Sequence, residues 1–171
     1  MNFVSNTLHR TVRWPKCRLK HVASINDEVL SKTTDPDWEL EYVDISNVSN
    51  KGRIAGIQRY SFERAPSRAR RIVRDGDIIV STVRTYLKAV ARIKDPPDNM
   101  IVSTGFAVVR PGQDLDHNFA SYALQSEDFI EQVVAESQGI SYPAITSERL
   151  GCIPVSLPPR EKQPAIADYL D

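Results

Sequence analysis

Two groups of side chains in the middle of the chain suit contact with phosphate oxygens. One is the run of arginines in RARRIVR, and the other is the polar segment STVRTYLK that follows an apolar stretch. A planar guanidinium matches phosphate oxygens or the major-groove edge of guanine, and Ser and Thr hydroxyls contact phosphates or bases. Phosphate neutralisation would give affinity, while a few side chains would read sequence. The candidate contacts are Arg68, Arg70, Arg71, Arg74, Thr82, Arg84, Tyr86 and Lys88.

The basic residues are concentrated in one quarter of the chain. The sequence has 22 Lys and Arg and 22 Asp and Glu, so its formal net charge is +0. The segment from Lys51 to Lys94 alone holds 12 basic and 3 acidic residues, which makes it net +9 and the remainder net −9. A local positive field influences partner choice even in a neutral molecule. A phosphate-binding surface is one interpretation, and a solvated basic face is the other.

A second candidate contact is the segment SQGISYPAI near the C-terminus. The amide of Gln138 can bind adenine in a bidentate manner, and Gly139 allows close approach of the backbone. Tyr142 can stack on a base or bond a phosphate. The alternative is that Gly139 ends a helix and an ordinary loop follows. The candidate contacts from this segment are Gln138, Gly139, Ser141 and Tyr142.

The sequence lacks the short motifs that would indicate an enzyme. There is no G-x-x-x-x-G-K-[ST] phosphate loop, no G-x-G-x-x-G, no Cys-x-x-Cys and no G-x-S-x-G. His9, His21 and His117 are scattered without the spacing of metal ligands. We therefore expect a non-catalytic protein with no cofactor and no metal site. A catalytic site assembled only in space is the remaining alternative, with the basic loop binding an anionic substrate.

The segments around the candidate residues have the composition of β-strands. Asp75-Gly76 predicts a turn, and the apolar run at 78–80 predicts a buried strand directly after it. The arginine run should therefore lie before this turn, and the STVRTYLK segment should form a loop after the strand. Further strands are predicted at 40–49, 56–62 and 89–93, and on both sides of Gly105. A short amphipathic helix is predicted at 17–25 from the spacing of Leu19, Val22 and Ala23.

The periodicity changes to that of helices after residue 116. Apolar residues at three- and four-residue spacing between 117 and 136 predict two consecutive helices, with Ser126 as N-cap of the second. One helical turn is expected at 146–151, a strand at 152–158, and a final helix from about Gln163, because Pro164 is tolerated only in a first turn. Strands followed by helices predict an α+β domain with a mixed, curved β-sheet and helices mostly in the C-terminal half.

Length and composition are those of one globular domain. The 171 residues include 41% apolar and 26% charged residues. No apolar run approaches the roughly 18 residues of a membrane helix, and the N-terminus has no apolar core of a signal peptide. Cys17 and Cys152 are far apart in the sequence and fit reduced thiols better than a disulfide framework. These features predict a cytoplasmic protein.

Several segments also stand in an order that is typical of one protein family. They are DGDIIVST, STGFAVVRP, the paired helices, SQGISYPAITSERLGCIPVSLPP and REKQPAIADYLD. With these motifs the chain resembles the target recognition domain of type I restriction–modification specificity subunits, from about Arg18 to Asp171. The family's last helix usually begins Glu-Gln, whereas this chain has Glu161-Lys162-Gln163-Pro164. Helix onset should therefore be later than the resemblance alone implies.

The resemblance implies a DNA-binding module without catalysis. In the family, two such domains are separated by long helices, and each reads one half of a split DNA sequence. Carried onto this chain, it implies an N-terminal extension at 1–17, a recognition domain at 18–160 and the start of a conserved spacer helix at 161–171. The implied partners are double-stranded DNA, modification (adenine methyltransferase) subunits and restriction subunits. The C-terminal helix would meet a second recognition domain or a second copy, and no membrane is involved.

The leading hypothesis is therefore the specificity subunit, half-subunit or fragment of a type I restriction–modification complex. It would bind double-stranded DNA sequence-specifically and direct adenine methylation and cleavage by its partners. The alternative is a protein-interaction or scaffolding module that has lost DNA binding. The family does not identify which side chains contact bases, so the candidate contacts rest on charge and loop composition.

Overall fold

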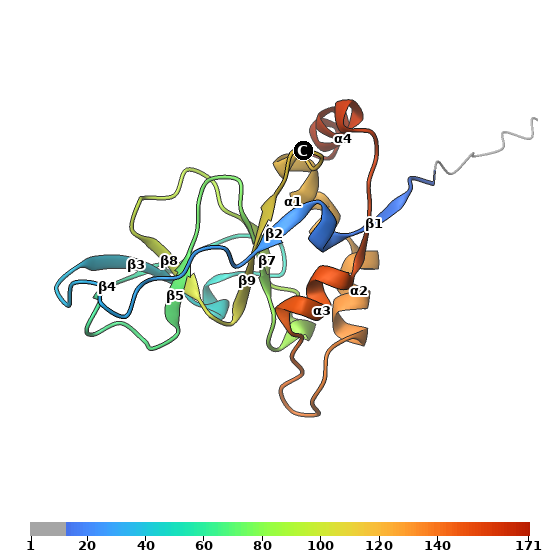
Figure 1. Cartoon of the computed structure of the whole chain (residues 1–171). Helices are drawn as coiled ribbons and strands as arrows, with labels where there is room; N and C mark the ends of the chain where they lie inside the picture. Colours follow the sequence, from blue (N-terminus) through green and yellow to red (C-terminus); the bar gives the residue numbers. More distant parts are fainter. Residues whose placement is uncertain (1–12) are drawn as a thin grey trace, which may run out of the picture.

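A computed structural model describes residues 13–171 and places the strands in three sheets (Figure 1). The strands are β1 Lys16–Arg18, β2 Ala23–Ile25, β3 Glu39–Val43, β4 Gln58–Ser61, β5 Ala69–Ile72, β6 Ile78–Ser81, β7 Val90–Arg92, β8 Met100–Ser103, β9 Phe106–Pro111 and β10 Pro154–Ser156. The α-helices are α1 His117–Gln125, α2 Glu127–Ala135, α3 Ser147–Cys152 and α4 Gln163–Leu170. Short 3₁₀ turns are η1 Leu19–His21, η2 Ile45–Asn47, η3 Thr85–Leu87 and η4 Arg160–Lys162.

The two larger sheets have four strands each. The central sheet has the antiparallel order β2-β9-β6-β7, and the lateral sheet has the order β4-β3-β8-β5. The lateral sheet is mixed, because β3 and β8 run parallel while β4 and β5 are antiparallel to them. A third, two-stranded sheet joins β1 to β10, so that Lys16 lies opposite Ser156. These observations confirm the predicted α+β class with a mixed sheet and helices mostly in the C-terminal half.

The central sheet is buried on both faces. Successive side chains of a strand point to opposite faces, and β6 has apolar side chains on both, namely Ile78, Ile79 and Val80. Ile78 and Val80 pack into the cluster formed with the helices, whereas Ile79 packs into the cluster shared with the lateral sheet. Figure 1 shows this layering, with the central sheet between the lateral sheet and α1 to α3. Strand β6 is therefore a firmly held support for the loop that follows it.

The C-terminal helices form where the sequence predicts them. Ser126 accepts a hydrogen bond from the backbone N of Phe129 and caps α2, and Asp116 caps α1 in the same way. Helix α4 begins at Gln163, with Pro164 in its first turn. The side chain of Gln163 is completely buried and accepts from the backbone N of Asp116 at 2.7 Å. Among residues 13–171, no helix is both long and apolar enough to cross a membrane.

Three local predictions are wrong. Residues 17–25 do not form a helix, because β1 and β2 pair with β10 and β9 and only η1 separates them. Tertiary backbone pairing thus overrides a weak helical spacing, although Leu19, Val22 and Ala23 all reach the core. Helix α2 ends at Ala135, so Gly139 is not its terminator. The strand predicted at 40–49 stops at Val43, where Asp44 caps η2.

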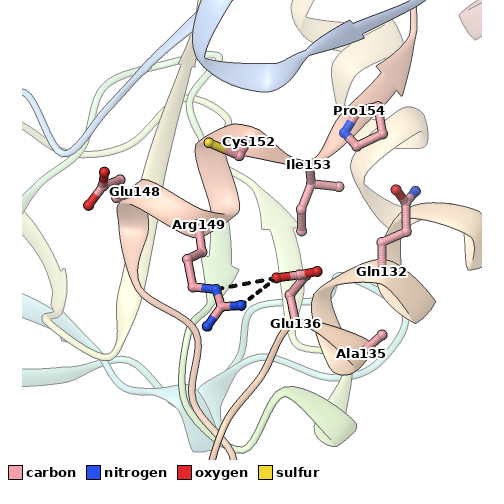
Figure 2. A pocket seen from close by; sticks show the side chains of 8 residues that line it. All are labelled: Gln132, Ala135, Glu136, Glu148, Arg149, Cys152, Ile153 and Pro154. Carbon is pink, nitrogen blue, oxygen red and sulfur yellow. Dashed lines mark hydrogen bonds and ion pairs between the residues drawn. The ribbon is translucent and has the colours of Figure 1, made fainter.

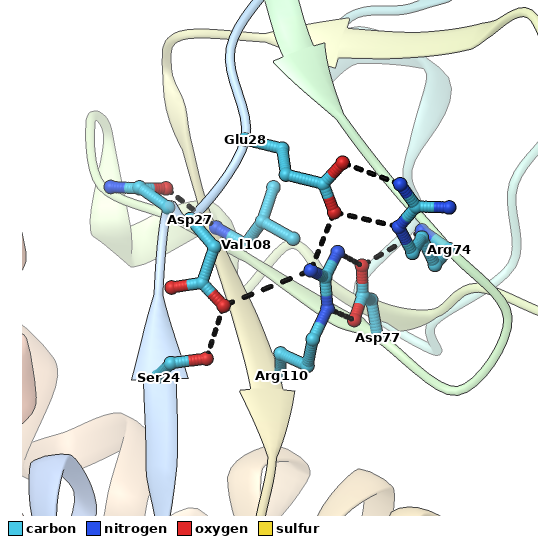
Figure 3. A network of polar contacts seen from close by, with 8 residues as sticks. Ser24, Asp27, Glu28, Arg74, Asp77, Val108 and Arg110 are labelled. Carbon is cyan, nitrogen blue, oxygen red and sulfur yellow. Dashed lines mark hydrogen bonds and ion pairs between the residues drawn. The ribbon is translucent and has the colours of Figure 1, made fainter.

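An ion network joins the two larger sheets at the start of β6 (Figure 3). Asp77 is almost completely buried and receives two hydrogen bonds of 2.8 Å from the guanidinium of Arg110 in β9. Arg110 also donates to Glu28 at 2.7 Å. Glu28 in turn binds Arg74, at 2.6 Å and 2.5 Å. Because Arg74 follows β5 and Arg110 belongs to the central sheet, the network connects the sheets through charge-assisted bonds.

The network makes stability depend on pH in the acid range. Hydrogen bonds from Arg74 and Arg110 lower the pKa of Glu28 from 4.5 to about 2. A lowered folded-state pKa gives stability that is fully present above the unfolded pKa and is lost as pH falls toward 2. We expect urea titrations between pH 2 and 7 to show that Glu28→Gln is less stable than wild type at pH 7 and that this difference shrinks below pH 4.5.

The exposed Glu63, which forms none of the described ion pairs, provides the matched control. Glu63→Gln should follow wild type at every pH. A stability difference for Glu28→Gln that stays constant between pH 2 and 7 would contradict the assignment.

Candidate nucleic-acid interface

The two polar segments that lie far apart in the sequence are hydrogen-bonded to each other. The backbone N of Arg84 donates to the carbonyl of Pro143 at 2.8 Å, and the backbone N of Ile145 donates to Thr82 at 2.9 Å. The hydroxyl oxygens of Thr85 and Ser137 are 2.9 Å apart. We call residues 82–88 and 137–146 together the paired loops. Figure 1 shows the second of them as the extended connection between α2 and α3. Folding thus unites two candidate sites into one surface.

The loop between α2 and α3 is closed at its base. The backbone N and O of Gln138 exchange hydrogen bonds of 2.8 Å and 2.9 Å with Ala144, which makes a short two-stranded ladder. Closer to the helices, the guanidinium of Arg149 donates to the carboxylate of Glu136 at 3.2 Å and 2.9 Å (Figure 2). Both side chains are about half exposed, so this ion pair contributes about 0.5 kcal/mol. The ladder therefore does more to define the loop than the ion pair does.

This ion pair forms part of the wall of a groove of about 460 Å³, and Figure 2 shows the side chains that line it. Its lining comes from α2, α3 and the start of β10, namely Gln132, Ala135, Glu136, Glu148, Arg149, Cys152, Ile153 and Pro154. The groove lies at the base of the loop rather than at its tip. None of the twelve candidate contacts lines it.

The exposed end of the paired loops combines cations with apolar rings. The guanidinium of Arg84 lies 5.0 Å from the centre of the Tyr142 ring, within cation–π distance. Tyr142 is 65% exposed, Tyr86 is 52% exposed, and Lys88 is exposed beside it. Neither Arg84 nor Lys88 takes part in an ion pair within residues 13–171. Neither charge is therefore held in a described ion pair, and Arg84 can act on an anionic partner. Lys88 lines a pocket together with the acidic side chain of Glu127.

Both of these cations have left-handed backbone conformations. Arg84 has φ 50° and Lys88 has φ 53°, one on each side of η3. This region is uncommon for residues other than glycine and costs on the order of 1 kcal/mol each. Hydrogen bonds around the loop stabilise these conformations. Across the two ends of the loop, the backbone N of Ser81 donates to the carbonyl of Ala89 at 2.9 Å. The loop thus presents its cations in a defined geometry.

The hydroxyl of Thr82 is buried and bonded within the protein, so it does not face solvent. Its backbone N and Oγ1 both donate to the carbonyl of Gly105, at 2.8 Å and 2.9 Å, and the residue is buried. A Cβ at Gly105 would lie 2.7 Å from Cδ1 of Ile45, so only glycine fits this turn without displacement of Ile45. Thr82 was expected as a DNA contact, and the structure shows its hydroxyl already bonded within the protein.

Of the other predicted residues of the loop between α2 and α3, Gly139, Ser141 and Tyr142 lie beyond the base that Gln138 forms with Ala144. Gln138, Ser141 and Tyr142 are exposed. Gly139 has φ +107°, and a Cβ there would meet the carbonyl oxygen of Tyr142 at 3.1 Å. Glycine is therefore needed for the bend, which turns the tip away from the ladder.

The arginine run lies along β5 and at its two ends, before the Asp75-Gly76 turn as predicted. The carbonyl of Arg68 accepts from Thr104 at 2.8 Å, beside the Gly105 turn, so Arg68 lies at the same end of the sheets as the paired loops. Its guanidinium is 3.5 Å from the carboxylate of Asp44. The guanidinium of Arg70 lies over the ring of Phe62 at 4.7 Å. Burial lowers the pKa of Arg71, and its Nε is buried without a described hydrogen-bond partner.

Arg74 lies beyond the opposite end of β5, in the ion network with Glu28. The sequence grouped it with Arg68, but the whole of β5, Ala69–Ile72, lies between the two residues. The structure therefore brings Arg68 toward Arg84, whereas Arg74 is already neutralised at a distance from the paired loops.

The charge-based reading of the sequence missed two exposed apolar residues on this surface. Ile140 has a relative exposure of 103%, and Leu87 is 41% exposed. Both stand inside polar segments, SQGISY and TYLK, and an apolar residue isolated in a polar segment was the signal available in the sequence.

Within residues 13–171, no three His, Cys, Asp or Glu residues come together in a group that could hold a metal ion.

A family model of the type I restriction modification DNA specificity domain matches residues 12–171, which is nearly the whole chain. The chain belongs to this family. This specificity domain shares 28% identity over 108 residues with the HindI specificity subunit of Haemophilus influenzae, covering 61% of this chain and 24% of that protein. The resemblance found in the sequence motifs is thereby confirmed.

Solved structures agree with this assignment. The HsdS subunit from Thermoanaerobacter tengcongensis superposes with a TM-score of 0.81 and 34% identity, over 92% of this chain and 41% of that one. A structure determined to explain complex assembly and conformational transition of the type I R-M system gives the same values. The S subunit from M. genitalium, at 20% identity and a TM-score of 0.59, shows the fold alone. The specificity domain spans less than half the length of each of these relatives.

The role of Thr82 can be tested with a near-isosteric change. Thr82→Val removes the Oγ1 bond to Gly105 and should lower the free energy of unfolding by about 1 kcal/mol, whereas Thr82→Ser retains the hydroxyl and should lose less. Hydrogen exchange of the Ile145 amide, which donates to Thr82, should become faster in Thr82→Val. Unchanged exchange at Ile145 would mean that the hydroxyl does not stabilise the paired loops.

Proposed function

We propose that the specificity domain binds double-stranded DNA sequence-specifically through the paired loops. It does so as the specificity subunit, half-subunit or fragment of a type I restriction–modification complex in the cytoplasm. Modification and restriction subunits carry out adenine methylation and cleavage, and the domain itself is non-catalytic. The observation that carries this proposal is the union of two separately predicted contacts into one surface that presents Arg84, Lys88 and Tyr142.

The chemistry of the paired loops favours binding over catalysis. The segments TVRTYLK and SQGISYPAIT contain cations, hydroxyls, an amide and tyrosine rings. They contain no carboxylate, imidazole or thiol that would serve as a general base or nucleophile at neutral pH. Cations supply affinity for phosphates, and the Gln138 amide and Arg84 guanidinium have the bidentate geometry that reads adenine and guanine in the major groove.

The contribution of the cations is measurable from the salt dependence of binding. We expect Arg84→Ala/Lys88→Ala to weaken binding of a short duplex and to reduce the slope of log K against log salt by about 0.9 for each lost phosphate contact. Arg59→Ala is the matched control, because Arg59 lies in β4 and is paired with Glu41. Fluorescence anisotropy from 50 to about 300 mM salt provides the measurement.

Two outcomes of this titration would contradict the proposal. The first is a double variant with the affinity and salt slope of wild type, which would remove the paired loops from the DNA interface. The second is wild-type protein without salt-sensitive affinity, which would favour the scaffolding alternative. Arg68→Ala and Arg74→Ala extend the test to β5, where only Arg68 lies on the side of the paired loops.

Function in the complex can be tested by co-expression with the modification subunit and mapping of methylated adenines. We expect methylation at one sequence motif, and Arg84→Ala/Lys88→Ala should abolish it while the complex still forms. A split motif would require two recognition surfaces. A folded wild-type complex without any methylation would contradict the role in directing modification.

The proposed spacer helix gives a physical basis for two surfaces. Helix α4 lies at 163–170, within the segment 161–171, after the recognition domain proposed at 18–160. Near its end, Tyr169 is 89% exposed and Leu170 is 50% exposed. Exposed apolar side chains on a helix favour contact with another helix. The spacer would connect a second recognition domain or pair with a second copy.

A further inference from the structure

Ile140 stands out on the paired loops, because it is a large apolar side chain with a relative exposure of 103%. Scattered exposed apolar residues are normal in proteins. Ile140, however, is surrounded in the sequence by Gln138, Gly139 and Ser141, which are polar or lack a side chain. It makes no contribution to the described hydrophobic clusters. Its side chain is therefore available to a partner of the loop.

The backbone on both sides of Ile140 is held in place. The ladder between Gln138 and Ala144 fixes the two sides of the loop, with bonds of 2.8 Å and 2.9 Å. The left-handed Gly139 produces the bend immediately before Ile140. On the other side, the Tyr142 ring lies under the guanidinium of Arg84. An apolar side chain held on such a closed loop loses little conformational freedom when it meets a partner.

The size and surroundings of the loop indicate which part of a duplex it meets. The major groove of B-DNA, about 12 Å wide, admits an element as narrow as two paired extended segments. The loop is of this kind, because a single β-bridge between Gln138 and Ala144 joins its two sides. Next to the tip, Arg84 supplies the cation that would anchor the loop on phosphate or guanine. Of the four base pairs' major-groove edges, only thymine presents an apolar group, its C5-methyl.

We propose that Ile140 is a specificity-determining residue that contacts a thymine C5-methyl group in the major groove. This inference rests on the proposed function and assigns one base preference to one side chain. An apolar wedge inserted between base steps is the competing use of such a residue, and it would kink the duplex by unstacking. Binding through a wedge would not depend on the thymine methyl group. Methyl contact and wedge insertion can therefore be distinguished by removing that methyl group.

The test begins with selection of duplexes from a randomised pool by the wild-type chain at constant salt. In the selected duplex, each thymine is then replaced by deoxyuridine, which removes only the methyl group. We expect one or two positions where this replacement weakens wild-type binding about fourfold, the change for exposing one buried methyl. In Ile140→Ser the same replacements should have no effect, and Ile140→Val should retain part of the sensitivity.

Ile57→Ser is the matched control, because Ile57 is a 40% exposed isoleucine outside the paired loops. It should keep the full thymine sensitivity, and thermal unfolding should show that all variants are folded. Equal sensitivity to deoxyuridine in Ile140→Ser and wild type overturns the inference, as does a selected duplex without any sensitive thymine. If the selection enriches a sequence but gives either of these two results, the proposed function still holds and only the inference about Ile140 is overturned. If the selection enriches no sequence, both the proposed function and the inference about Ile140 are overturned.

Discussion

The candidate interface depends on the three hydrogen bonds of Thr82. Its N and Oγ1 bind the carbonyl of Gly105, and its own carbonyl accepts from Ile145. Through these bonds the end of β6, the turn between β8 and β9, and the loop between α2 and α3 are fixed relative to one another. Each of these segments alone is a polar loop with few partners. Together they form a surface whose cations have a defined spacing, which a phosphate backbone requires.

Strand β6 places the paired loops precisely because the strand itself is held at both ends and on both faces. Asp77 anchors its start in the ion network with Arg110, and Thr82 anchors its end. Between them, Ile78, Ile79 and Val80 pack alternately toward the helices and toward the lateral sheet. A loop that emerges from such a strand is more precisely placed than one that emerges from an edge strand.

Arginine has different roles at the two ends of the sheets, although the residue type is the same. Arg74 and Arg110 are bound by Glu28 and Asp77, so their charge stabilises the fold. Arg84 lies over Tyr142 and has no described carboxylate partner, so its charge remains available. The net +9 of residues 51–94 is therefore not one uniform surface. The partners of each guanidinium decide whether it stabilises the domain or faces a ligand.

The sequence by itself determined the features that depend on neighbouring residues. The pair α1 and α2, the Ser126 cap, the start of α4 at Gln163 and the α+β order follow from periodicity, capping and the restriction on Pro164. The family motifs were also recognisable, because they are short and keep their order. The candidate segments 82–88 and 137–146 could each be identified from residue types alone.

Only the tertiary structure decided how these segments meet. The helix predicted at 17–25 yields to strands β1 and β2, because their partners β10 and β9 lie far along the chain. The neutralisation of Arg74 by Glu28 spans 46 residues, and the bond from Arg84 to Pro143 joins two loops with no shared motif. Local propensities act over a few residues and carry no information about such pairings. The exposure of Ile140 likewise results from how the loop is closed, and residue type alone would have assigned it to the core.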